Sequence, residues 1–221
     1  KKLSDVTGRT CRAYAVYRDK PVARRELEDL RAAIIHHRRE GLCREVVEVV
    51  LPEPGPARDR WLTRSEAARL LWSAYRYKET NGPKRGQHTR RHVARFILVA
   101  LYTGTRAGAV CGASLGPVGG GSGWIDLERG VFYRRGQEEK ETKKRRPPAR
   151  LPLRLLGHMR RWHKNGQNYV VEWMGKPVST GIEKAFKKAA FGANLTDVTQ
   201  HSLRHTCATW LMQKGTPIWE A

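Results

Sequence analysis

The chain has 221 residues, with 43 Lys or Arg against 21 Asp or Glu, so its formal net charge at pH 7 is +22. A hydrophobic content of 39% argues against disorder, and no stretch of the sequence is long and apolar enough to cross a membrane. This positive excess predicts a polyanionic partner, of which nucleic acid is the most common, whereas a solvated coat of charge usually mixes its signs more evenly.

The compartment is predicted from the N-terminus and the cysteines. The opening Lys-Lys-Leu-Ser-Asp lacks the apolar core of a secretory signal, so we expect a soluble intracellular protein in the cytoplasm, associated with the nucleoid. The sequence has no Cys-x-x-Cys pair that would indicate a zinc site. The cysteines lie far apart in the sequence, which argues against a disulfide framework. We expect these cysteines to be reduced, mostly as packing residues: Cys11, Cys43, Cys111 and Cys207.

Residues 1 to 50 are predicted to form a small, partial helical domain. A helix is expected over residues 21 to 40, because Leu27, Leu30 and Ile34 share one face and Gly41 provides a stop. Three prolines in residues 51 to 57 then favour an extended connector, so a linker is predicted over residues 51 to 60.

Residues 61 to 221 are predicted to form the main domain, beginning with two helices. Thr63 and Glu66 have the spacing of a capping box, which indicates a helix start. The apolar spacing over residues 93 to 101 predicts a second, buried helix that Gly104 ends. Arg106 is therefore expected just beyond the end of a buried helix.

A small antiparallel sheet and further helices complete the predicted domain. Residues 124 to 134 indicate a hairpin that turns near Gly130, and residues 149 to 153 indicate the last strand of the sheet. Helical stripes follow at residues 155 to 162, 182 to 189 and 203 to 211. The predicted fold class is mainly α with a small antiparallel β-sheet (α+β).

The last predicted helix carries the candidate functional residues. At 100° per residue, His201, Arg204 and His205 lie on one face, whereas Leu203 and Cys207 point broadly the opposite way. A guanidinium binds phosphate oxygens bidentately and keeps its charge. His201 and His205 also have the spacing of a metal pair, but the residue after His201 is Ser and the Arg204 cation would oppose a dication. Taken alone, a His-x-x-Arg motif occurs as often on an ordinary surface helix as in a functional site.

Three separated elements together resemble the tyrosine recombinases, the phage integrase family. They are residues 103 to 106 (Thr-Gly-Thr-Arg) after a buried helix, a lysine-bearing basic hairpin, and residues 201 to 206 (His-Ser-Leu-Arg-His-Thr). The resemblance covers residues 57 to 221 and implies that family's catalytic fold. The helix at residues 21 to 40 is similar to the end of the family's N-terminal core-binding domain, which clamps DNA.

The resemblance implies a role for each matched residue. Arg106 and Arg204 would hold the scissile phosphate and stabilise the charge of its transition state, and His201 would assist proton transfer. The general acid would be Lys143 or Lys144, with Lys140 as a third choice, although lysines of a basic loop usually only contact phosphates. The family reaction proceeds through a phosphotyrosine and needs neither a metal nor a nucleotide cofactor.

The sequence departs from the family pattern in two places. The family's nucleophilic Tyr follows the His-x-x-Arg motif, whereas all tyrosines here precede it: Tyr14, Tyr17, Tyr75, Tyr77, Tyr102, Tyr133 and Tyr169. Tyr102 is closest to Arg106 in sequence, but we expect it in the core. Ala109 replaces an acid that many family members carry. We therefore expect this chain, which ends at Ala221, to bind DNA without cleaving it.

The expected partners are double-stranded DNA and, for the full-length protein, other copies of itself in a tetramer on DNA. No association with a membrane is expected. A non-catalytic DNA-binding protein on the same fold is the alternative, in which the basic surface only clamps the duplex. A general RNA-binding protein ranks lower, because Trp and Phe mostly fall on helical core stripes instead of a stacking face.

Overall fold

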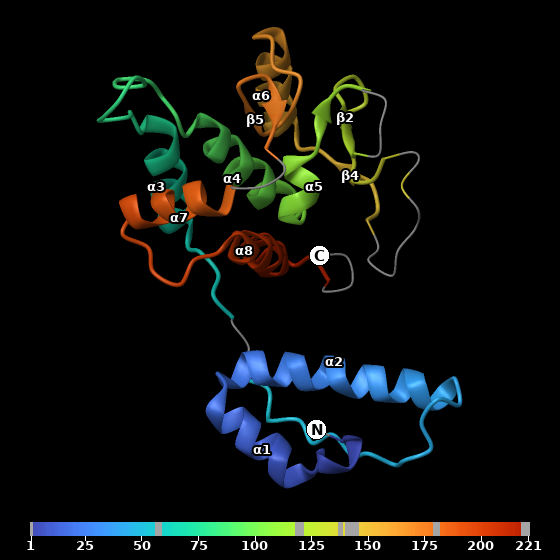
Figure 1. Ribbon diagram of the computed structural model, residues 1–221. Coiled ribbons are helices and arrows are strands. Elements are labelled where there is room, and N and C mark those ends of the chain that lie inside the picture. Colours follow the sequence, from blue (N-terminus) through green and yellow to red (C-terminus); the bar gives the residue numbers. More distant parts are fainter. Residues whose placement is uncertain are drawn as a thin grey trace. The chain divides into compact units, whose positions relative to one another are not determined.

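The computed structural model describes residues 2–55, 59–117, 122–136, 139, 146–178 and 182–217. Helices dominate, and the chain divides into two compact units, Lys1–Arg58 and Asp59–Ala221 (Figure 1). Within the described ranges, no helix combines the length and the apolar character that a membrane span requires. The division falls within the predicted linker.

The first unit is built on two helices, preceded by the short 3-10 helix η1 (Leu3–Asp5). Helix α2 (Lys20–Arg39) confirms the predicted helix, and α1 (Gly8–Tyr17) was not predicted. Leu27 and Ile34 of α2 are buried together with Cys11 of α1 and Val49 of the extended segment that follows. The small apolar core therefore depends on all three segments of the unit.

The first part of the predicted linker packs on this unit. Leu51 contacts the apolar cluster, and the Arg24 guanidinium donates a hydrogen bond to the Pro52 carbonyl. At the other end, Arg60 belongs to the second unit, where it forms an ion pair of 2.6 Å with Glu66. The two ends of the predicted linker, at residues 51–52 and at Arg60, therefore pack on the first and the second unit respectively.

The second unit is a helical domain arranged around α4 (Figure 1). Helix α4 contacts α3, α5, α6, α7 and α8, and Val93, Phe96, Ile97 and Val99 on it are fully buried. An apolar helix surrounded in this way loses water on most of its surface, which is the main favourable contribution to folding. The helices are α3 (Arg64–Arg76), α4 (Arg91–Thr103), α5 (Ala107–Cys111), α6 (Leu153–Lys164), α7 (Ile182–Gly192) and α8 (Gln200–Gln213).

A four-stranded sheet lies beside the helices. Its order is β1 (Ser114–Leu115), β2 (Trp124–Asp126), β3 (Val131–Tyr133) and β4 (Ala149–Arg150). The predicted hairpin is confirmed, since β2 and β3 are antiparallel and Gly130 has a positive φ of 66° at the turn. Strand β4 is antiparallel to β3, as predicted.

Two details of the sheet differ from the prediction. Strand β1 pairs with β2 in parallel, so the sheet is mixed. Strand β4 covers only Ala149–Arg150, because Pro152 caps α6, which begins at Leu153. A second hairpin, β5 (Glu172–Trp173) with β6 (Lys176–Pro177), was not predicted.

Candidate functional site

The corner between α4 and α5 presents the first candidate arginine. Gly104 ends α4 in the left-handed conformation, with φ 58°, and its N–H donates to the Ala100 carbonyl at 2.9 Å. The Thr103 hydroxyl donates to the Thr105 hydroxyl at 2.8 Å, which closes the corner. Arg106 follows as the N-cap residue of α5, and its side chain is exposed. The prediction that Arg106 lies just beyond a buried helix end is confirmed.

Arg204 reaches this corner from α8. Its Nη1 donates to the Gly104 carbonyl at 2.6 Å, although the two residues are 100 positions apart in the sequence. Leu203 and Cys207 of α8 are buried in the opposite direction, as predicted, and a Cβ added to Gly104 would lie 3.4 Å from the Cys207 sulfur. The close packing of α8 on the end of α4 therefore brings Arg204 to the corner that carries Arg106.

His201 lies on the same face of α8 and is exposed. Its ring centroid is 4.5 Å from that of His205, in an edge-to-face arrangement. Partial burial lowers the pKa of His201, and the positive charges of His205, Arg204 and Arg106 lower it further. Burial and these neighbouring charges therefore both favour the neutral form of His201. The structure brings together three of the predicted site residues, namely Arg106, His201 and Arg204.

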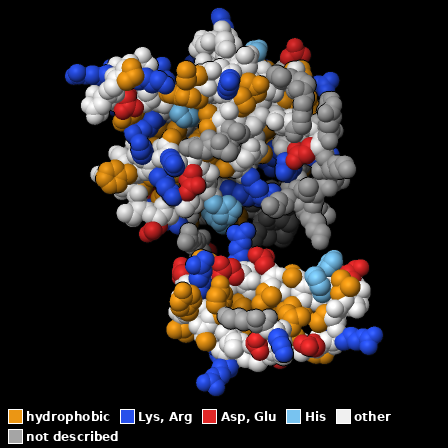
Figure 2. All heavy atoms as spheres, in the orientation of Figure 1, with side chains coloured by type: hydrophobic (Ala, Val, Ile, Leu, Met, Phe, Trp, Pro, Cys, Tyr) orange, Lys and Arg blue, Asp and Glu red, His pale blue; other side chains and the backbone are white. Residues whose placement is uncertain are grey.

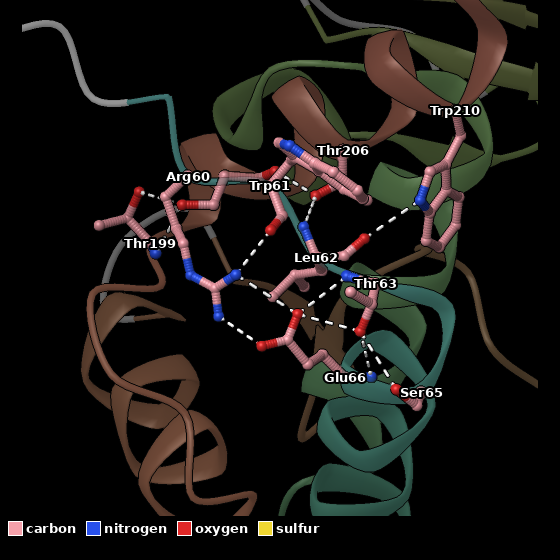
Figure 3. Close-up of polar contacts among 10 residues, drawn as sticks. Arg60, Trp61, Leu62, Thr63, Ser65, Glu66, Thr199, Thr206 and Trp210 are labelled. Carbon is pink, nitrogen blue, oxygen red and sulfur yellow. Dashed lines mark hydrogen bonds and ion pairs between the residues drawn. The ribbon is translucent and has the colours of Figure 1, made fainter. Parts of the chain in front are cut away.

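A network of hydrogen bonds fixes α8 against the start of α3 (Figure 3). The Leu62 N–H donates to the Thr206 hydroxyl at 2.9 Å, and the Trp210 indole N–H donates to the Leu62 carbonyl at 3.1 Å. The Thr206 hydroxyl in turn donates to the Ser202 carbonyl at 2.6 Å. Both main-chain groups of Leu62 are thus satisfied by side chains of the helix that carries His201 and Arg204.

The predicted capping box continues this network. The Glu66 carboxylate accepts from the Thr63 N–H at 2.9 Å and forms the ion pair with Arg60 (Figure 3). The Arg60 guanidinium and the Thr63 N–H together lower the pKa of Glu66 to about 2. The Arg64 guanidinium also lies 3.6 Å from the ring centre of Trp210. The start of α3 is therefore a rigid support for α8.

Arg134 is a further basic residue of this group that sequence reasoning missed. It follows β3, and its Nη2 donates to the Thr103 carbonyl at 2.9 Å. Burial lowers the pKa of Arg134, and the charges of Arg204 and Arg106 lower it further. An Arg at the end of a predicted hairpin strand gives no signal of this position, because its contact with α4 depends on how the hairpin packs.

The remaining candidates are placed as follows. The predicted general acids Lys143 and Lys144, and Lys140 as the third choice, lie outside the described residues. Tyr102 is 42% exposed, so the prediction that it belongs to the core is wrong; only some positions near the end of α4 face inward. Ala109, which stands where many family members carry an acid, lies in α5. The groups that accept hydrogen bonds from Arg134 and Arg204 are backbone carbonyls and not a carboxylate.

The group is suited to hold an anion on an open surface. Arg106 and His201 are exposed, Arg204 is half-buried, and guanidinium groups bind phosphate oxygens with defined geometry. The four cysteines are free thiols, and the described part of the chain contains no cluster of three His, Cys, Asp or Glu that could hold a metal ion. Lys and Arg side chains are spread widely over the visible face of the second unit (Figure 2).

Comparisons with known proteins identify the family and the fold of this chain. Residues 60–220 match the family model described as the phage integrase family. The solved structure of XerA recombinase is similar at 18% identity and a TM-score of 0.53, covering 99% of this chain and 74% of that chain. The Tn1549 transposon integrase, solved in complex with circular intermediate DNA, has 18% identity and a TM-score of 0.60, covering 98% and 74%. No curated protein matches at a significant level.

Proposed function

The chain belongs to the phage integrase family, and on this premise we propose that it is a site-specific DNA recombinase that breaks and rejoins DNA through a phosphotyrosine intermediate. The single observation that carries this proposal is the contact between Arg204 and the Gly104 carbonyl. It brings the guanidinium of α8 to the corner that presents Arg106, with His201 on the same face of α8. Two guanidiniums and an imidazole can bind a phosphodiester and stabilise the charge that develops as it reacts.

In the proposed reaction, Arg106 and Arg204 bind the two non-bridging oxygens of the scissile phosphate. Their charges stabilise the negative charge that increases in the pentavalent transition state, and because they are already in place they need little reorganisation. His201, whose pKa is lowered, accepts or shares a proton at the same phosphate. A tyrosine hydroxyl attacks the phosphorus, which forms the phosphotyrosine and breaks the bond to the 5′ oxygen. A lysine from the sequence after β3 protonates this leaving oxygen; Lys143 and Lys144 are the proposed candidates. No metal or nucleotide takes part.

Double-stranded DNA is the proposed partner. The net charge of +22 favours a polyanion, and 21 of the Lys and Arg residues lie in residues 51 to 150 against nine acids. The Tn1549 integrase, which shares the fold, was solved with DNA bound. We propose that the first unit completes a clamp on the duplex, as in the family's core-binding domain, and that the full-length protein acts as a tetramer on DNA.

Binding is tested by competition between a duplex and a single strand of the same sequence at fixed ionic strength. The proposal expects a preference for the duplex, and a dissociation constant that rises steeply with salt, by about a thousandfold or more between 50 and 200 mM if at least six phosphates are contacted. Equal affinity for single-stranded RNA would favour a general RNA-binding protein instead.

The chemistry is tested with nicked suicide duplexes drawn from a pool of randomised sequence. The 221-residue chain is compared with a chain extended by whatever its reading frame encodes beyond Ala221, and covalent adducts are separated from free DNA in detergent. The proposal expects a phosphotyrosine adduct in the extended chain, and the loss of that adduct when Arg106→Met or Arg204→Met is introduced into it. Tyr102→Phe identifies an adduct formed on Tyr102. Tight duplex binding without any adduct would favour the alternative, a non-catalytic DNA-binding protein on this fold.

A further inference from the structure

Two arginines from different elements are attached to consecutive carbonyls at the end of α4. Arg134 donates from Nη2 to the Thr103 carbonyl at 2.9 Å, and Arg204 donates from Nη1 to the Gly104 carbonyl at 2.6 Å. These carbonyls belong to the C-terminal end of a helix, where the partial negative charge of the peptide dipoles favours cations. The corner that presents Arg106 is therefore held from the sheet side by Arg134 and from the α8 side by Arg204.

The charge of Arg134 is poorly compensated where it lies. Its Nε is buried and has no hydrogen-bond partner among the described residues. Within the same described ranges, none of Arg106, Arg134 and Arg204 forms an ion pair with a carboxylate. A partly buried cation with an unpaired buried donor is costly, and two neighbouring guanidiniums increase that cost. An anion bound by Arg106 and Arg204 would offset this repulsion.

The backbone of the hairpin is shaped to deliver Arg134 to this position. A Cβ on Gly123 would lie 2.5 Å from the Tyr133 carbonyl oxygen and 2.9 Å from the Arg134 carbonyl carbon, so only glycine allows this approach. The rings of Trp124 and Tyr133 stack with their centroids 4.6 Å apart, which fixes β2 against β3 at the same point. The direction of Arg134 is therefore set by the sheet and not by a flexible loop.

From these contacts we propose that Arg134 is a positioning residue of the phosphate site: it fixes the α4–α5 corner so that Arg106 and Arg204 bind the same anion. The proposal rests on the proposed function, in that the anion is a phosphate of DNA. Arg134 acts through the corner and its charge, because its Nε is buried and its Nη2 is already bound to Thr103. It also attaches the start of the basic segment that follows β3 to the end of α4.

The test uses inorganic phosphate as the probe and the 221-residue chain. The guanidinium Nε–H signals of Arg106 and Arg204 are followed by NMR during a phosphate titration, and both are expected to shift with one common dissociation constant. In Arg134→Met that constant is expected to rise about tenfold or more, the scale of one lost charge-assisted contact, and the two signals no longer follow one curve. Arg150→Met, which removes an exposed charge from the same sheet, serves as the matched control and leaves the titration unchanged.

Two further measurements distinguish a positioning role from a general loss of folding. Arg134→Met keeps the apolar volume and removes a partly buried charge, so its melting temperature is expected to match or exceed that of the unchanged protein. Gly123→Ala keeps the charge but displaces the backbone of Arg134, and is expected to weaken phosphate binding in the same direction. Arg134→Lys is expected to restore only part of the affinity, because an ammonium lacks the planar, branched guanidinium.

The proposal is overturned if Arg134→Met binds phosphate as tightly as the unchanged protein, or if it loses affinity only in proportion to a lowered melting temperature. The phosphate titration requires no strand transfer. An extended chain whose phosphate affinity depends on Arg134 but which forms no covalent adduct would therefore contradict the proposed function and still support the role of Arg134.

Discussion

Thr206 of α8 accepts a hydrogen bond from the main-chain N–H of Leu62, 144 residues earlier in the chain, at 2.9 Å. Both groups are buried, and Thr206 has no exposed surface. The same hydroxyl donates to the Ser202 carbonyl, so it joins the segment before α3 to the helix that carries His201 and Arg204. The site thus depends on a contact that contributes no charge to it.

Replacing Thr206 with Val removes this hydroxyl but keeps the shape of the side chain. The buried Leu62 N–H then has no acceptor, and we expect the free energy of unfolding to fall by about 1–3 kcal/mol. Urea denaturation measures this change. Thr209→Val, in the same helix, is the matched control and is expected to cost less. A Thr206→Val protein as stable as the control would show that Leu62 finds another partner.

Replacing Arg204 with Lys tests the connection between α8 and the α4 corner. An ammonium can bind either the Gly104 carbonyl or a phosphate but cannot match the fork geometry of the guanidinium. We expect phosphate or duplex affinity to fall by about tenfold, which corresponds to about 1.4 kcal/mol, at an unchanged melting temperature. Arg154→Lys in the first turn of α6, where the residue is exposed, is the control. Equal loss in both variants would indicate a general effect of charge.

His201 is expected to titrate below its ordinary pKa, because burial and the charges of His205, Arg204 and Arg106 oppose its protonation. The unfolded chain therefore takes up this proton at a higher pH than the folded protein does. The contribution of His201 to the free energy of unfolding is therefore present above the ordinary histidine pKa of about 6.5 and should decrease as the pH falls below that value. NMR titration of the His201 imidazole ring measures this pKa directly. Arg106→Met should raise that pKa, and saturating phosphate should raise it further, whereas Arg150→Met should not change it.

Glu66 provides a second pH-dependent contribution, of ordinary sign for a carboxylate. Its pKa is lowered to about 2 by Arg60 and the Thr63 N–H, so its ionised form stabilises the folded state. This stability is present above the ordinary pKa of 4.5 and is lost as the pH falls from there toward 2. We expect Glu66→Gln to be less stable than the unchanged protein at pH 6, with the difference shrinking below pH 4.

The control for this prediction is Glu183→Gln in α7. Glu183 pairs with Lys187, but both side chains are 67% exposed, and exposed pairs contribute little to stability. Urea denaturation between pH 3 and pH 7 compares the two variants. A constant difference between Glu66→Gln and the unchanged protein across this range would show that the carboxylate charge is not the source of the stability.

Much of the helical framework could be predicted from local sequence. The capping box of Thr63 and Glu66 marks the start of α3, and Gly104 ends α4, because both signals act within a few residues. Helix α1 was missed because its apolar stripe is weak and its two buried residues, Cys11 and Ala15, are small. The parallel pairing of β1 was missed because strands of two or three residues carry too little pattern to specify a partner.

By itself, the sequence determined the excess of positive charge, the approximate positions of most of the helices, and the placement of His201 and Arg204 on one face of a helix. These properties depend on composition and on interactions between near neighbours. Only the tertiary structure decided that Arg204 meets the Gly104 carbonyl, that Thr206 supports Leu62, and that Arg134 joins the group. Each of these contacts joins residues at least 31 positions apart, and their geometry is set by the packing of whole elements, which no local pattern contains.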